Sequence, residues 1–202
     1  MSTSASLLAR HLRRRRIALL AGCGLAIVVL AAVLFLAAST TMSGFTARIL
    51  AGAAAPPTAD DGVIDADAPL TVDDHDHPAM TRLDPALRDA LRAAQAAASA
   101  DGITFDVTSG WRSDAYQRWL LTDAIRTYGS REIAEQYVAA PEVSSHVTGH
   151  AVDIGPLDAQ LWLADHGREW GLCQTYANER WHFERATDAG GECPTPHLDA
   201  RG

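Results

Sequence analysis

Lysine is absent from this 202-residue chain, whose 17 basic residues are all arginine. Together with the abundance of alanine, the absence of lysine reflects the composition of the genome more than the function of the protein. Basic residues are also few after position 16. The remainder of the chain contains 12 arginines and 25 acidic residues. Because phosphate binding needs a basic surface, this deficit argues against nucleic acid as a partner. Apolar residues are not lacking, and at 48% of the chain they suffice for a folded core.

Charged residues are absent from positions 17–38, directly after the five arginines of residues 1–16. As a helix, this run reaches roughly 33 Å, which is enough to cross a bilayer core. Because arginine-rich flanks stay inside, we expect a cytoplasmic N-terminus, a single transmembrane helix over 17–38 and an extracytoplasmic remainder. A cleaved signal peptide, with the small residues Ala37 and Ser39 near a cut, is the alternative. Cys23 lies in a stretch similar to a lipoprotein box, but the apolar run continues past it, so we interpret it as a helix residue.

Residues 39–70 are rich in Ala, Pro, Asp and Gly and show no helical or alternating periodicity. This composition predicts a flexible spacer, followed by one folded domain over residues 71–202. Acidic residues and histidines mix between Asp73 and His77, where they suggest a metal site. Short runs of this kind are more often solvated loops, and we interpret this one so.

Helical and strand patterns alternate through residues 71–202. Asp84 followed by Pro85 is a good helix start, and Ile103, Phe105 and Val107 alternate with polar residues as in a half-buried strand. The short turns favour hairpin pairing, so we predict an α+β fold with a small, mainly antiparallel sheet and flanking helices. The predicted helices begin at Pro85, Ser113, Ser130 and Asp158, and the predicted strands span residues 103–108, 151–154, 172–176 and 181–184.

Two pairs of potential metal ligands stand out in the second half of the chain. His146 and Asp153 lie seven residues apart, and Glu179 and His182 lie three apart. A catalytic zinc site needs three protein ligands and one open position for water, so these four residues form a candidate site.

The segments around these pairs carry a wider pattern. Ser144 to Asp153 reads SSHVTGHAVD, Asn178 to His182 reads NERWH, and Ser109 to Ser113 reads SGWRS, with Gln117 following. In this order the three segments resemble the VanY/VanX-type D,D-carboxypeptidases, a metallopeptidase family that shares its fold with the hedgehog signalling domain. The resemblance covers roughly residues 70–195.

The resemblance implies the role of each residue. His146, Asp153 and His182 would bind Zn²⁺, and Glu179 would be the general base. Arg112 would stabilise the negative charge of the transition state and hold an anionic peptide end. Substrate contacts are expected at Arg112 itself and at two further residues, Gln117 and Ser144.

Two residues complicate the pattern. His150 follows His146 by four, a spacing that would serve a helical metal site, but Gly149 and the strand-like residues after it argue against a helix. We therefore keep Asp153 as the ligand. Arg180 stands where many relatives have proline, and it neither supplies nor removes a catalytic group.

Cys173 and Cys193 are the two cysteines outside the apolar run. In an oxidising exterior we expect them to form a disulfide, and free buried thiols are the alternative.

The sequence therefore predicts a monomeric, membrane-anchored zinc D,D-carboxypeptidase that removes the terminal D-alanine from peptidoglycan stem peptides. An endopeptidase with the same zinc site, and a non-catalytic zinc-stabilised wall-binding module, are the alternatives. A plain transmembrane scaffold leaves both motifs unexplained.

Overall fold

The computed structural model describes residues 55–202. The expected cytoplasmic terminus, the transmembrane helix over 17–38 and the first half of the spacer lie outside the described residues. Within residues 55–202, no helix combines the length and apolarity needed to span a bilayer.

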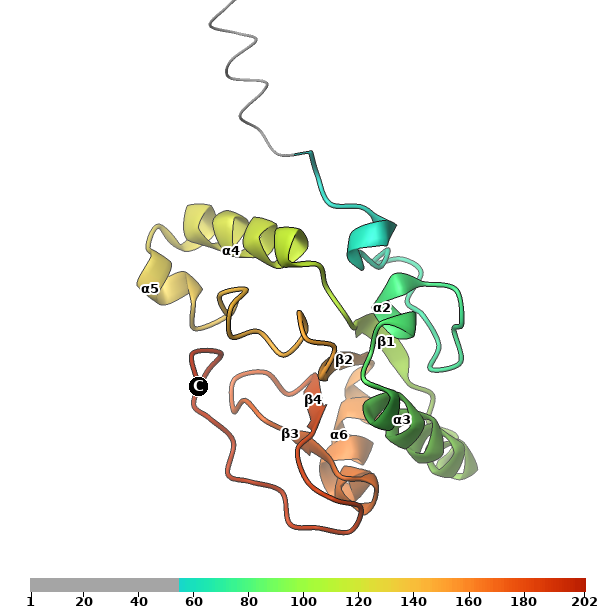
Figure 1. Cartoon of the computed structure of the whole chain (residues 1–202). Helices are drawn as coiled ribbons and strands as arrows, with labels where there is room; N and C mark the ends of the chain where they lie inside the picture. The colour runs from blue at the N-terminus through green and yellow to red at the C-terminus, as the bar shows by residue number, and fades with distance from the viewer. Residues whose placement is uncertain (1–54) are drawn as a thin grey trace, which may run out of the picture. The chain divides into compact units, whose positions relative to one another are not determined.

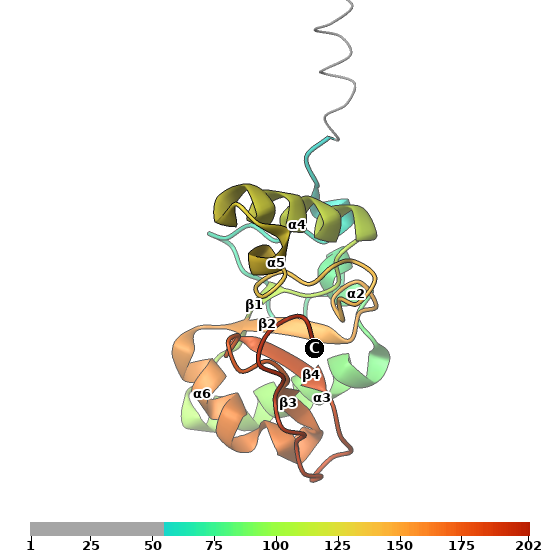
Figure 2. The ribbon, with the colours of Figure 1, turned by 90° about the vertical axis from the view of Figure 1, so that its left-hand side faces the viewer.

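A four-stranded sheet in the order β1-β2-β4-β3 forms the centre of the described chain. All three neighbouring pairs are antiparallel, as the sequence predicted. Figure 2 shows α3 and α6 on one side of this sheet and α4 and α5 on the other. The strands are β1 (Asp106–Ser109), β2 (Ala151–Gly155), β3 (Leu172–Gln174) and β4 (His182–Arg185), and the longer helices are α3 (Pro85–Ala98), α4 (Asp114–Tyr128) and α6 (Leu157–His166).

The helices begin where their capping residues stand. Asp84 Oδ1 accepts a hydrogen bond from Leu87 N at the start of α3, and Ser113 Oγ accepts one from Tyr116 N at the start of α4. Each bond satisfies a backbone N–H that has no partner inside its helix. Gly129 ends α4 with a φ of 74°, in the left-handed region that favours glycine. The remaining elements are the short helices α2 (Pro78–Thr81) and α5 (Arg131–Ala134) and the 3-10 turns η1 (Ala59–Asp61), η2 (Ser99–Asp101) and η3 (Gly167–Trp170).

Strand β1 begins three residues later than the predicted strand over 103–108. The backbone of residues 103–105 forms hydrogen bonds with a side chain in place of a neighbouring strand. Gln95 of α3 accepts a hydrogen bond from Phe105 N at 2.6 Å and donates one to Ile103 O at 3.0 Å. The alternation itself is confirmed, since Phe105 and Val107 are fully buried while Thr108 is exposed.

The main core lies between the sheet and helices α3 and α6. Val152 and Ile154 of β2 and Phe183 of β4 point into it, together with Leu87 and Leu91 of α3. Alternation along a strand then directs the intervening residues of β2 and β4 to the opposite face of the sheet. A second, smaller apolar cluster joins α4 and α5. We call α4, α5 and the residues up to 140 the α4–α5 lobe (Figure 1).

Part of the predicted spacer belongs to the folded domain. Asp61 accepts hydrogen bonds from Ser113 through its backbone and side-chain oxygens, both at 2.8 Å. Leu70 exchanges two backbone hydrogen bonds with Val107 beside β1. Gly62 has a φ of 93°, and a side chain there would collide with the Trp111 carbonyl. The spacer therefore does not extend to residue 70, because these contacts are made by backbone and polar groups that leave no apolar periodicity to detect.

The acidic and histidine-rich run after residue 72 shapes a loop. Asp74 Oδ1 accepts hydrogen bonds from the backbone N–H groups of Asp76 and His77. His77 Nδ1 in turn accepts one from Ala79 N at the start of α2. These side chains are engaged in turns and caps, which agrees with the loop interpretation.

Candidate metal and catalytic centre

Strand register brings two of the predicted ligands together. Asp153 of β2 and His182 of β4 are direct cross-strand partners, so their side chains leave the same face of the sheet side by side. That face is the one opposite the main core.

His146 reaches the same place from the loop before β2. Its Nδ1 lies 2.8 Å from Gly110 O, and its backbone carbonyl accepts a hydrogen bond from Arg112 N. Gly149 lets the loop turn back towards β2, with a φ of 77° at a point where a side chain would strike the Arg82 carbonyl. The glycine of the sequence pattern is therefore needed for close approach of backbone to backbone.

The three ligand atoms have the spacing of a tetrahedral metal site. His146 Nε2 lies 3.2 Å from His182 Nδ1, and each nitrogen lies 3.3 Å from Asp153 Oδ1. A tetrahedral zinc ion with bonds of about 2.0–2.1 Å places its ligand atoms about 3.3–3.4 Å apart. Within residues 55–202, this is the group of three potential metal ligands that the fold assembles.

The protonation of the two imidazoles also fits a cation. The carbonyl of Gly110 can only accept a hydrogen bond, so His146 Nδ1 carries the proton and Nε2 has a free lone pair. The carboxylate of Glu184 lies 3.0 Å from His182 Nε2, which leaves the lone pair on Nδ1. Unless a proton occupies one of these nitrogens, two lone pairs and a carboxylate face one another, and Asp153 Oδ1 is buried without any hydrogen bond. Such an arrangement needs a positive charge at its centre.

Electrostatics supports the same conclusion. Burial lowers the pKa of His146. Burial would raise the pKa of Asp153, but the neighbouring His146, His182 and Arg112 hold it well below its usual range. Burial opposes the charged form of His182 too, yet the neighbouring carboxylates of Asp153 and Glu184 raise its pKa to about 9. Between these two carboxylates the site attracts either a proton or a metal ion.

Glu179 lies one turn before His182 and faces the same space. The segment turns through hydrogen bonds from Glu179 N to Tyr176 O and from His182 N to Glu179 O. Glu179 Oε2 lies 3.8 Å from His182 Nδ1, and its Oε1 is buried without a partner. Burial is the main cause that raises the pKa of Glu179 to about 7, a value suited to proton transfer near neutral pH.

Arg112 is held in place by three contacts. It donates from Nε to Ser109 Oγ at 2.8 Å, from Nη1 to Gln117 Oε1 at 3.1 Å and from Nη2 to Asp153 Oδ2 at 2.8 Å. Three of its five N–H groups are thus used, and two remain for a ligand in the cavity. Gln117 is buried and also donates to Ala139 O, so its amide orients Arg112 in addition to lining the cavity.

Glu184 belongs to the site and was not among the predicted residues. Its Oε1 accepts hydrogen bonds from three groups, namely Ser145 Oγ at 2.7 Å, His182 Nε2 at 3.0 Å and Thr175 Oγ1 at 3.1 Å. Residues two apart on a strand share a face, so the predicted strand through His182 already placed Glu184 beside it. That signal was present in the sequence.

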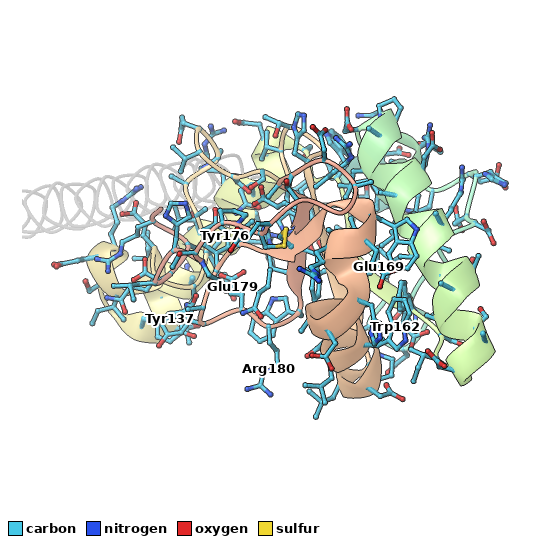
Figure 3. The ribbon with its side chains drawn as sticks, turned by 90° about the horizontal axis from the view of Figure 1, so that it is seen from below. Tyr137, Trp162, Glu169, Tyr176, Glu179 and Arg180 are labelled. Atoms are coloured by element: carbon cyan, nitrogen blue, oxygen red, sulfur yellow. A yellow bond between two sulfur atoms is a disulfide. The ribbon has the colours of Figure 1, made fainter. Side chains whose placement is uncertain are left out.

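The site opens into a cavity of about 180 Å³. Tyr137, Tyr176 and Glu179 lie on one side of the molecule, away from Trp162 and Glu169 (Figure 3). The complete lining consists of Arg112, Gln117, Leu120, Tyr137, Val138, Ala139, Ser144, Ser145, His146, Asp153, Tyr176, Glu179, Trp181, His182 and Ala200. Ser144, predicted as a substrate contact, is therefore present at the cavity.

The residues judged peripheral lie outside the centre. His150 is exposed, with Nδ1 2.9 Å from Thr148 Oγ1. Arg180 is exposed and points away from Glu179 (Figure 3). The Trp162 ring packs against Trp170 in the core.

The expected disulfide is confirmed between Cys173 and Cys193, whose Cα atoms lie 5.7 Å apart. Cys173 is the cross-strand partner of Glu184. The bridge therefore fastens the C-terminal segment to the edge of the sheet directly beside the site.

Two solved structures share the fold of this chain. A mutant of the vancomycin resistance D,D-pentapeptidase VanY, from a VanB-type cassette and in complex with Zn(II), matches with a TM-score of 0.50 and 24% identity over 67% of this chain and 83% of that one. VanYB in complex with D-alanine-D-alanine matches with a TM-score of 0.50 and 22% identity, over 60% of this chain and 83% of that one. The fold is that of the VanY-type D,D-peptidases.

The family follows from the sequence match. The family model described as VanY, D-alanyl-D-alanine carboxypeptidase, matches residues 80–187. The chain belongs to this family. It is 28% identical over 127 residues to a D-alanyl-D-alanine carboxypeptidase of Enterococcus faecalis (strain ATCC 700802 / V583), covering 50% of this chain. The chain spans about half the length of that relative, 46%.

Proposed function

We propose that this protein is a zinc-dependent D,D-carboxypeptidase that hydrolyses the terminal D-Ala-D-Ala bond of peptidoglycan stem peptides. The observation that carries the proposal is the triangle of ligand atoms of His146, Asp153 and His182, with edges of 3.2–3.3 Å, beside a buried Glu179. The two solved neighbours, one in complex with Zn(II) and one with D-alanine-D-alanine, support the choice of metal and substrate.

His146, Asp153 and His182 would hold the ion, and a fourth position would stay open towards the cavity. Bound zinc supplies Lewis acidity and lowers the pKa of a coordinated water towards 7. Glu179 accepts the proton of the attacking water at its unpaired Oε1 and donates it to the departing amine. Its raised pKa, about 7, allows both transfers near neutral pH.

Arg112 stabilises the negative charge that develops on the scissile carbonyl oxygen. Its guanidinium is fixed by Ser109, Gln117 and Asp153, so no reorganisation is needed when the charge appears. Together with His146 and His182, the same side chain keeps Asp153 ionised, which a metal ligand requires.

An enzyme is favoured over a zinc-stabilised binding module by Glu179. A purely structural zinc site is closed by four ligands and has no use for a buried carboxylate without a partner. Burying such a group costs free energy, which the fold tolerates where the group has a function.

We also propose that the domain works outside the cytoplasmic membrane, tethered by residues 17–38 and separated from them by a spacer. The disulfide supports an oxidising compartment, because such bonds are rare in the cytosol. The basic residues before position 17 support a cytoplasmic N-terminus.

The test uses the full-length chain in detergent, stripped of metal with a chelator and reloaded with Zn²⁺. A stem pentapeptide ending in D-Ala-D-Ala should release free D-alanine, measured by mass spectrometry, only from the reloaded protein. Stoichiometric zinc binding without release of D-alanine would reject the proposed activity.

A further inference from the structure

Residues 193–201, which we call the C-terminal strap, run from the edge of the sheet to the α4–α5 lobe (Figures 1 and 2). The strap begins at the Cys173–Cys193 disulfide. It is then bound to the segment before Glu179, because His197 N donates to Thr175 O at 2.9 Å and Ala177 N donates to His197 O at 2.8 Å.

The far end of the strap is attached to the opposite lobe. Ala200 N donates a hydrogen bond to Gln136 O at 3.3 Å, and Gln136 directly precedes Tyr137. The same carbonyl accepts a hydrogen bond from Asn178 Nδ2 at 2.8 Å. Asn178 directly precedes Glu179, so the strap and the base-bearing segment meet the α4–α5 lobe at one point.

Ala200 is thereby placed in the wall of the catalytic cavity. It is 5% exposed and lines the cavity with Tyr137 and Glu179. By contrast, Leu198 of the same strap is 86% exposed. The match to the family model ends at residue 187, so Ala200 and the rest of the strap lie outside the matched region.

The size of the cavity limits what can enter. Its volume of about 180 Å³ is below the roughly 300–1,000 Å³ that is usual for pockets that enclose drug-sized ligands. A peptide cut at an internal bond must leave the cavity at both ends. A peptide cut at its last bond needs room for a single residue beyond that bond, so its C-terminal end can lie inside the cavity.

We propose that the strap closes one end of the catalytic cavity, and that Ala200 is a specificity-determining residue that admits a small C-terminal residue and blocks a chain that continues beyond it. The inference relies on the proposed function for the identity of the substrate. The metal centre by itself does not determine whether the terminal bond or an internal bond is cut. The inference assigns the preference for the terminal bond to the strap.

The experiment measures binding separately from hydrolysis. In full-length, zinc-loaded protein carrying Glu179→Gln, calorimetry gives the Kd of a stem pentapeptide and of the same peptide with one further C-terminal residue. We expect the pentapeptide to bind at least ten times more tightly. Ala200→Leu in this background should weaken pentapeptide binding about tenfold, because the longer side chain fills part of the cavity. Leu198→Ala is the matched control and should change neither Kd.

A second variant, lacking residues 195–202 but keeping Cys193, should bind the two peptides with less than a threefold difference. The inference is overturned if this variant keeps the tenfold preference, or if Ala200→Leu binds both peptides as its parent does. Should the shortened chain not fold, the Ala200→Leu result decides by itself. Zinc affinity, measured for every variant, should be unchanged.

Hydrolysis by the wild-type chain separates this inference from the proposed function. Binding preference without turnover would reject the activity and leave the strap's role supported. Turnover of both peptides at equal rates would support a peptidase and overturn the strap's role. Failure of both peptides to bind at any concentration would overturn both the inference and the proposed function.

Discussion

Glu184 offers the sharpest test of the metal centre, because it touches a predicted ligand without contacting the ion. Its carboxylate holds the N–H of His182 and thereby keeps the Nδ1 lone pair directed at His146 and Asp153. Removing the carboxylate frees the ring to rotate or to change tautomer. Zinc affinity should fall while the ligand set itself is intact.

The magnitude follows from the kind of hydrogen bond. A bond to a charged acceptor contributes about 1.5–3 kcal/mol, and a neutral one about 0.5–1.5 kcal/mol. Glu184→Gln keeps an oxygen that can accept from His182, so we expect zinc to bind up to about tenfold more weakly. Glu184→Leu keeps no acceptor and also leaves Ser145 and Thr175 without their partner, so a loss of about 10–100-fold is expected.

The assay is competition for zinc against a chelator of known affinity, with circular dichroism and thermal unfolding as checks of the fold. Glu169→Gln is the matched control, because Glu169 is exposed and lies on the other side of the molecule from Glu179 (Figure 3). If Glu184→Leu binds zinc within twofold of the wild type while remaining folded, the reasoning about the orientation of His182 is wrong.

Three further predictions concern the same region. Glu179→Gln should reduce turnover about 10²–10⁴-fold with zinc affinity nearly unchanged, and retained activity would reject its role as the base. Zinc must displace the proton that His182 holds below a pKa of about 9, so apparent zinc affinity should rise about tenfold per pH unit below that value and level off above it. Calorimetry in two buffers of different ionisation enthalpy should show release of about one proton near pH 7.5, and no release would contradict this. Loss of the Cys173–Cys193 bridge, which spans 20 residues of sequence, should lower the free energy of unfolding by about 3 kcal/mol. Urea titrations with and without reductant measure this difference. An unchanged midpoint would show that the bridge adds no stability.

Local patterns predicted the elements because local physics forms them. Asp84 and Ser113 cap helices with their own side chains, and the alternation through Phe105 and Val107 follows from a sheet with one buried face. The candidate ligands were also found in the sequence, because each lies in a recognisable pattern. The boundary of the spacer was misjudged, since the contacts of Asp61 with Ser113 join residues 52 positions apart.

The sequence by itself determined the α+β class, the capped helices, the disulfide partners, the three candidate metal ligands and the candidate base. Only the tertiary structure decided that Asp153 and His182 are cross-strand partners, that Glu184 orients one imidazole, and that Ala200 lines the cavity. The physical reason is distance along the chain. Capping and alternation act within a few residues, whereas strand register and the path of the strap depend on how the whole chain packs.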